Sequence, residues 1–168
     1  MGHEFRIDQQ ADLDATPEQV WEAIATGPGI DSWFMGRTQV DGDRVTTFFG
    51  DYSPVTEITA SEPLKRFAHS SPPAEDGRFV AYEFLIEARS GTTVLRTGTS
   101  GFLPGDDWQD EFEAMTAGFE LFFATLTAYL GSNQDKRQTG NEMILMNVES
   151  GVQVSRAAGA ALLTRMFR

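Results

Sequence analysis

The chain has 168 residues, of which 40% are hydrophobic and 11% aromatic, enough for one domain with an ordinary hydrophobic core. Thirteen Lys and Arg against 25 Asp and Glu give a net charge of −12, which repels a phosphate backbone and argues against a nucleic-acid partner. The absence of cysteine excludes disulfides, thiolate metal ligands and a cysteine nucleophile.

The two histidines, His3 and His69, have no paired ligand at helical spacing, so we expect neither a metal nor a cofactor. The first residues contain no apolar core of a secretory signal, and no apolar run approaches the roughly 18 residues of a membrane span. These patterns predict a cytoplasmic protein that does not enter a membrane.

The N-terminal part predicts one strand followed by two helices. Apolar and charged side chains alternate over residues 4–13, which is typical of a half-buried strand. Thr16 is followed by Pro17 and then by a glutamine placed to complete a capping box, so a helix begins there. Proline and glycine at 26–29 should end this helix, and a second short helix is expected over 30–34.

A period of two residues, interrupted by turn sequences, predicts six further strands. We place these strands at 37–40, 44–49, 52–60, 66–70, 79–89 and 92–102. Short turns between consecutive strands favour antiparallel pairing.

A long helix is expected over 108–130, after the acidic turn at 106–107. Its apolar residues fall at steps of four and three along one stripe: Trp108, Phe112, Met115, Phe119, Phe122, Leu126 and Tyr129. The order of elements therefore predicts an α+β fold in which an antiparallel sheet and a final helix share one core.

The last residues differ from the rest, because Phe167 is the only aromatic residue after Tyr129 and basic residues outnumber acidic ones there. We therefore expect a domain at 1–131 and a C-terminal tail at 132–168. Within the tail, residues 143–146 are compatible with a strand and 157–167 with a short helix.

Several motifs resemble the START-like (SRPBCC, Bet v-like) superfamily, and within it the homologues of the activator of the 90-kDa heat-shock chaperone ATPase. They are ATPEQVW at 15–21, IDSWF at 30–34, VTEI at 55–58, EPLKRF at 62–67 and the closing helix at 118–130. The family often has tryptophan after the glycine of the last helix, where this chain has Phe119. The resemblance implies a helix-grip fold, in which a curved antiparallel sheet wraps around the last helix and leaves a cavity.

In such a fold the apolar stripe of the last helix also lines the cavity, and the short helix before the sheet closes one end of it. The residues that we expect to bind a ligand there are Trp33, Phe34, Tyr82, Phe84, Arg96, Phe112, Met115, Phe119 and Phe122. Arg96 would orient a ligand carbonyl or carboxylate. The alternative for Arg96 is an exposed cross-strand partner of Glu83 or Glu87.

No catalytic constellation is evident. His69 shares a strand face with Ser71, but the plainer interpretation is a surface histidine near a turn. Glu57 and Glu83 could meet in the sheet, although the position of Glu83 between Tyr82 and Phe84 favours a solvent-facing side chain.

Three functions remain open. The first is binding of a small, mostly apolar molecule without catalysis. The second is a cyclase-like or hydrolase-like enzyme that uses the same cavity, with His69, Arg96 and Tyr82 as the groups to test. The third, implied by the resemblance, is interaction with a chaperone in a stress response. Homodimerisation is also left open.

Overall fold

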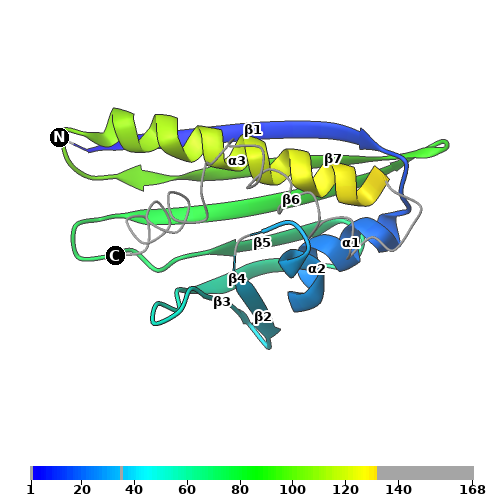
Figure 1. Cartoon of the computed structure of the whole chain (residues 1–168), viewed down its shortest axis with the longest axis horizontal. Coiled ribbons are helices and arrows are strands. Elements are labelled where there is room, and N and C mark those ends of the chain that lie inside the picture. The colour runs from blue at the N-terminus through cyan, green and yellow to red at the C-terminus, as the bar shows by residue number, and fades with distance from the viewer. Residues whose placement is uncertain (1, 35, 132–168) are drawn as a thin grey trace.

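The computed structural model, described for residues 2–34 and 36–131, is a seven-stranded antiparallel sheet curved around a long helix (Figure 1). The elements are β1 His3–Leu13, α1 Pro17–Ala25, α2 Gly27–Asp31, β2 Arg37–Asp41, β3 Arg44–Phe48, β4 Val55–Glu62, β5 Arg66–Ser70, β6 Phe79–Arg89, β7 Thr92–Leu103 and α3 Trp108–Gly131. The predicted helix-grip α+β fold is therefore confirmed. The elements expected at 143–146 and 157–167, and the tail at 132–168, lie outside the described residues.

The strand order is β1-β7-β6-β5-β4-β3-β2, so the first strand does not pair with the next one in the sequence. β1 instead pairs with β7 along its whole length, from His3 opposite Leu103 to Leu13 opposite Thr93. The two short helices carry the chain from one edge of the sheet to the other (Figure 1). Within 2–34 and 36–131, no helix combines the length and apolarity needed to cross a membrane.

Most predicted strands agree with the structure to within one residue at each end, but the strand expected at 52–60 is wrong at its start. Phe49 and Tyr52 exchange backbone hydrogen bonds of 2.8 and 3.2 Å around a turn that contains Gly50, whose φ is +62°. The chain reverses there, and regular pairing resumes only after Pro54, so β4 begins at Val55.

Thr26 ends α1 and begins α2, which is why the second helix lies three residues earlier than expected. Its hydroxyl donates to the Glu22 carbonyl at 2.7 Å and accepts from the Gly29 amide at 3.0 Å. Pro28 falls in the first turn of α2, where a missing amide hydrogen leaves no acceptor unpaired. A Cβ on Gly29 would lie 1.9 Å from the Glu22 carbonyl oxygen, so only glycine allows the two helices this close.

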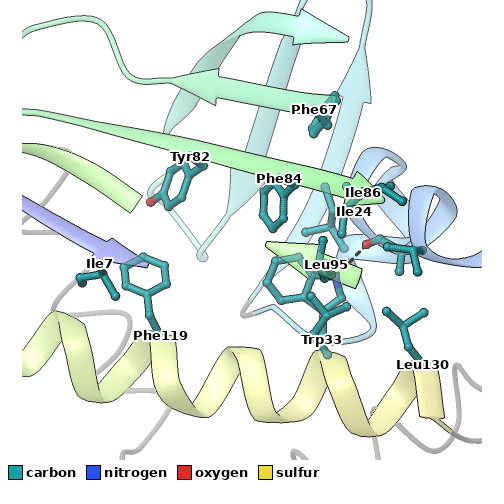
Figure 2. Packing of buried hydrophobic residues seen from close by; sticks show 14 of the residues in the cluster. Ile7, Ile24, Trp33, Phe67, Tyr82, Phe84, Ile86, Leu95, Phe119 and Leu130 are labelled. Carbon is teal, nitrogen blue, oxygen red and sulfur yellow. Dashed lines mark hydrogen bonds between the residues drawn. The ribbon is translucent and has the colours of Figure 1, made fainter. Parts of the chain in front are cut away.

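The core lies between the sheet and the helices, on the face that we call the inner face. Along β6, Val80, Tyr82, Phe84 and Ile86 are buried and the residues between them are more exposed, as the period of two predicts. α3 covers this face and buries Met115, Leu126 and Leu130 almost completely (Figures 1 and 2).

A buried ion pair fixes the N-terminal end of α3 to the sheet. Arg78, just before β6, donates from Nη1 to Oε2 of Glu111 in the first turn of α3 at 2.8 Å. Only 11% of the Arg78 side chain and 9% of the Glu111 side chain are exposed. Each charge therefore depends on the other for compensation, because neither has full access to water.

We expect Arg78→Met to lower the free energy of unfolding by about 3 kcal/mol, since it leaves the Glu111 carboxylate buried without a cation. The double variant Arg78→Met/Glu111→Leu should recover most of that loss, because it removes both charges and keeps apolar volume. Urea unfolding of the three proteins measures both effects. A double variant as unstable as the single one would show that packing, and not charge compensation, is lost.

Candidate functional site

A cavity of about 60 Å³ lies between the inner face of the sheet and the middle of α3. Its lining comes from α1, the α2 region, six strands and α3, and is mostly aromatic and aliphatic. The aromatic lining residues are Trp33, Phe34, Phe49, Tyr82, Phe84, Phe119, Phe122 and Phe123. Figure 2 shows Tyr82 and Phe84 projecting from β6 towards α3, and Phe119 projecting from α3 towards the sheet.

The aromatic rings contact one another in a chain around this space. The ring centroids of Phe34 and Phe122 are 4.9 Å apart, and those of Phe119 and Phe122 are 6.2 Å apart. Phe119 is buried, whereas Phe34 and Phe122 are half-buried. The half-buried pair therefore covers the cavity where the chain after α2 meets α3.

Trp33 is held in place by its indole nitrogen as well as by packing. Its Nε1 donates to the Ala23 carbonyl oxygen at 2.7 Å, which satisfies an acceptor near the C-terminal end of α1. The ring contacts Phe84 and Phe34, with centroid distances of 6.0 and 5.5 Å. Four of the nine predicted ligand-binding residues, Trp33, Phe34, Tyr82 and Phe84, thus line the cavity from the sheet and α2 side.

A row of polar side chains crosses the inner face within this apolar lining. Its members are Thr56, His69, Tyr82 and Thr99, one from each strand from β4 to β7. His69 is the register partner of Tyr82, which is also the partner of Thr99. The Thr56 hydroxyl lies 2.7 Å from Nδ1 of His69 and 3.3 Å from the Val45 carbonyl oxygen.

Burial keeps both titratable groups of this row uncharged at neutral pH. Desolvation lowers the pKa of His69 from its ordinary 6.5 to about 4, so its imidazole is neutral. Desolvation also raises the pKa of Tyr82, and the neighbouring Tyr52 hydroxyl adds to that rise. The polar row therefore offers hydrogen bonds to a ligand but no charge.

The Tyr82 hydroxyl has no hydrogen-bond partner among the described residues, although the atom is buried. The whole residue is 8% exposed, and its ring lies between those of His69 and Phe119, at 5.0 and 5.9 Å. Leaving a buried hydroxyl unsatisfied costs about 1 to 3 kcal/mol. Such a group in a cavity wall marks a place where a ligand could bind.

The prediction that Arg96 points into the cavity is wrong. Its Nη1 donates to Glu87 Oε2 at 2.9 Å and its Nε to Gln10 Oε1 at 3.1 Å, on the outer face of the sheet. The alternative, a cross-strand partner of Glu87, is confirmed. Neighbouring residues of a strand normally point to opposite faces, so one of two adjacent apolar residues marks the buried face. On β7 the adjacent residues Val94 and Leu95 are both fully buried, so they do not tell which face Arg96 shares.

Phe112 and Met115 do not line this cavity, contrary to the sequence prediction. The Phe112 ring packs 6.1 Å from that of Phe5, and Met115 is fully buried. Both residues lie in the N-terminal half of α3, where the helix packs closely on the sheet. Phe119 and Phe122, one turn further along, do line the cavity as expected.

His69 is half-buried and lines the cavity on the inner face, so the interpretation as a surface histidine near a turn is wrong. Ser71 does not pair with it, because Ser71 Oγ accepts from the Val80 amide at 2.9 Å and lies 3.4 Å from the Val80 carbonyl oxygen. Glu83 bonds Arg66 at 2.8 Å on the outer face, as its solvent-facing parity predicted. Across residues 2–34 and 36–131, no three His, Asp or Glu side chains are grouped to hold a metal.

Sequence reasoning missed the threonines of the row and Gln9, whose Nε2 donates to the Phe119 carbonyl oxygen at 3.3 Å. A signal for Gln9 existed, since it shares parity with Phe5 and Ile7 on β1. Phe123 carried no comparable signal, because it lies beside the expected helical stripe rather than on it.

The fold is that of known START-like structures. The Aha1 dimer from Colwellia psychrerythraea is 18% identical, with a TM-score of 0.63 over 77% of this chain and 98% of that one. Protein MLL2253 from Mesorhizobium loti is 20% identical, with a TM-score of 0.62 over 82% and 98%. CalU16 from Micromonospora echinospora is 16% identical, with a TM-score of 0.57 over 82% and 83%. No protein-family model and no curated protein sequence matches the chain. At these identities the likeness establishes the Aha1-like, START-like fold and leaves function to the site.

The desolvated imidazole of His69 should make stability depend on pH. Because its pKa is about 4 when folded and near 6.5 when unfolded, the unfolded chain binds more protons between these values. The free energy of unfolding should therefore fall as the pH drops from 6.5 towards 4, by on the order of 2 kcal/mol from this residue. The variant His69→Gln keeps a hydrogen-bonding side chain and should lose this part of the fall.

Urea unfolding of wild type and His69→Gln between pH 7 and pH 4.5 measures the difference. Carboxylates such as Glu87, whose pKa is lowered by Arg89 and Arg96, titrate in both proteins and cancel in the comparison. If the free energy of unfolding falls equally with pH in both proteins, His69 is not desolvated in the folded state.

Proposed function

We propose that this protein binds a small, mostly apolar molecule in the cavity between the sheet and α3. The observation that carries the proposal is the aromatic cavity itself, which lies where the inner face and the helix would otherwise pack against each other. Protein interiors are normally close-packed, so space retained within a ring of large side chains calls for a reason. Apolar cavities with a few convergent polar groups are the usual form of a small-molecule site.

The size of the cavity indicates how a ligand enters. About 60 Å³ is room for a few water molecules, whereas an apolar cavity of about 150 Å³ holds a benzene ring. A ligand of that size must therefore displace side chains. Phe34 and Phe122 are the natural ones to move, because they are half-buried and cover the space between α2 and α3.

Binding without catalysis fits the chemistry of the lining better than an enzyme does. A general base works best with a pKa near the working pH, and the pKa of His69 is about 4. Arg96, another group that an enzyme would use, is on the other face of the sheet. Of the three groups expected for a cyclase-like or hydrolase-like enzyme, only Tyr82 and the weakly basic imidazole of His69 face the cavity.

The interaction with a chaperone stays a prediction of the family resemblance, and a cytoplasmic location stays a prediction from the sequence composition. The structure from Colwellia psychrerythraea is described as a dimer, and self-association of this chain is the corresponding expectation. Light scattering of the purified protein over a range of concentrations would measure it.

A charge placed at the cover of the cavity should abolish binding of an apolar probe. With saturating toluene, we expect the melting temperature of the wild-type protein to rise, because a ligand that binds only the folded state stabilises it. Phe122→Asp should fold, since Phe122 is half-buried, but it should lose the rise because the carboxylate must be desolvated.

Leu85→Asp is the matched control, since it puts the same group on the outer face between its register partners Arg66 and Arg96. It should keep the toluene-induced rise. An equal rise in both variants would contradict the cavity as the site, and no rise in wild type would contradict apolar binding. Native mass spectrometry of the purified protein tests for a co-purifying molecule.

A further inference from the structure

The polar atoms around Tyr82 differ in how far they are already satisfied. Gln9 Nε2 donates to the backbone of α3, and the Thr56 hydroxyl is within hydrogen-bond distance of both His69 and Val45. The Tyr82 hydroxyl, buried in the same lining, has no such partner among the described residues. It is the point in the wall at which a new hydrogen bond removes an existing penalty.

The group that Tyr82 would bind must be uncharged. The residues that line the cavity include no lysine or arginine, and the carboxylate of Glu83 is bonded to Arg66 on the outer face. A ligand carboxylate or ammonium group would lose its hydration without gaining a counter-charge. The neutral imidazole of His69 supplies no charge either.

The surroundings of the hydroxyl also limit the shape of the ligand. The His69 and Phe119 rings flank the Tyr82 ring, tilted by 31° and 59° to it. Trp33, Phe84 and Phe122 continue this wall of rings. Flat apolar bodies pack on such walls better than branched ones, because offset and edge contacts between rings are favourable.

We propose that the ligand is a flat, apolar molecule with an uncharged carbonyl group, and that the Tyr82 hydroxyl donates a hydrogen bond to that carbonyl oxygen. This inference rests on the proposed function and names the ligand class for the same cavity. A phenol is a good donor, and a ketone or ester oxygen accepts without bringing a proton of its own into the cavity. Tyr82 is then the residue that selects carbonyl compounds over hydrocarbons.

Two probes of nearly equal shape test the hydrogen bond. Acetophenone carries the carbonyl, and α-methylstyrene has a CH₂ group in place of the oxygen. We expect the ratio of their dissociation constants, acetophenone over α-methylstyrene, to rise about tenfold from wild type to Tyr82→Phe. Comparing ratios cancels the different hydration of the two probes, as in a double-mutant cycle.

A second measurement does not depend on any variant. Acetophenone labelled with carbon-13 at the carbonyl should show a downfield carbonyl resonance in the wild-type complex, as expected for an oxygen that accepts a hydrogen bond. Benzoate, which is flat and charged, should bind at least tenfold more weakly than acetophenone at pH 7.

The outcomes separate the two proposals. If both neutral probes bind and the ratio is the same in Tyr82→Phe, the hydrogen bond is refuted while apolar binding stands. Benzoate binding as tight as that of acetophenone would refute the requirement for an uncharged group. If neither neutral probe binds the wild-type protein, the ligand class and the proposed function fall together.

Discussion

The structure depends on one packing arrangement, the helix α3 lying along the concave inner face of the sheet. Arg78 and Glu111 fix its N-terminal end, and the fully buried Leu130 fixes its C-terminal end. Between these ends Phe119 and Phe122 of the helix line the cavity. The cavity therefore lies beneath the middle of the helix, between its two fixed ends.

The two short helices complete that arrangement from the open side. Thr26 makes α2 start where α1 ends, and the close approach at Gly29 fixes the angle between them. Trp33 then reaches back to the Ala23 carbonyl and presents its ring to Phe84. Thr26 and Gly29 do not line the cavity, but they fix the position of α2 and thereby the position of Trp33 in the cavity wall.

Local patterns predicted the elements well because each depends on a few neighbouring residues. The capping box at Thr16 and the alternation on β6 are of this kind, and both are confirmed. The site was harder, since it depends on which face each strand turns inward. Val94 and Leu95 are both buried, so parity on β7 could be read either way, and Arg96 was assigned to the wrong face. The capping role of Thr16 depends only on the next three residues of the chain. The face on which Arg96 lies depends on how β7 pairs with β1 and β6.

Four polar residues that cost stability lie together in the wall of the cavity. A desolvated imidazole, a buried hydroxyl with no partner among residues 2–34 and 36–131, and two threonines lie on an inner face where aliphatic side chains would pack better. Each lowers stability, and their neighbours in the core, such as Val80 and Leu95, show that the same strands readily carry apolar residues. Local and global preferences usually agree in a natural sequence, and exceptions concentrate where function requires them. Other polar side chains are buried elsewhere, such as Thr38, Thr93 and Thr125. These four, however, lie on adjacent strands in the wall of one cavity, and that clustering is the physical argument that supports a ligand there.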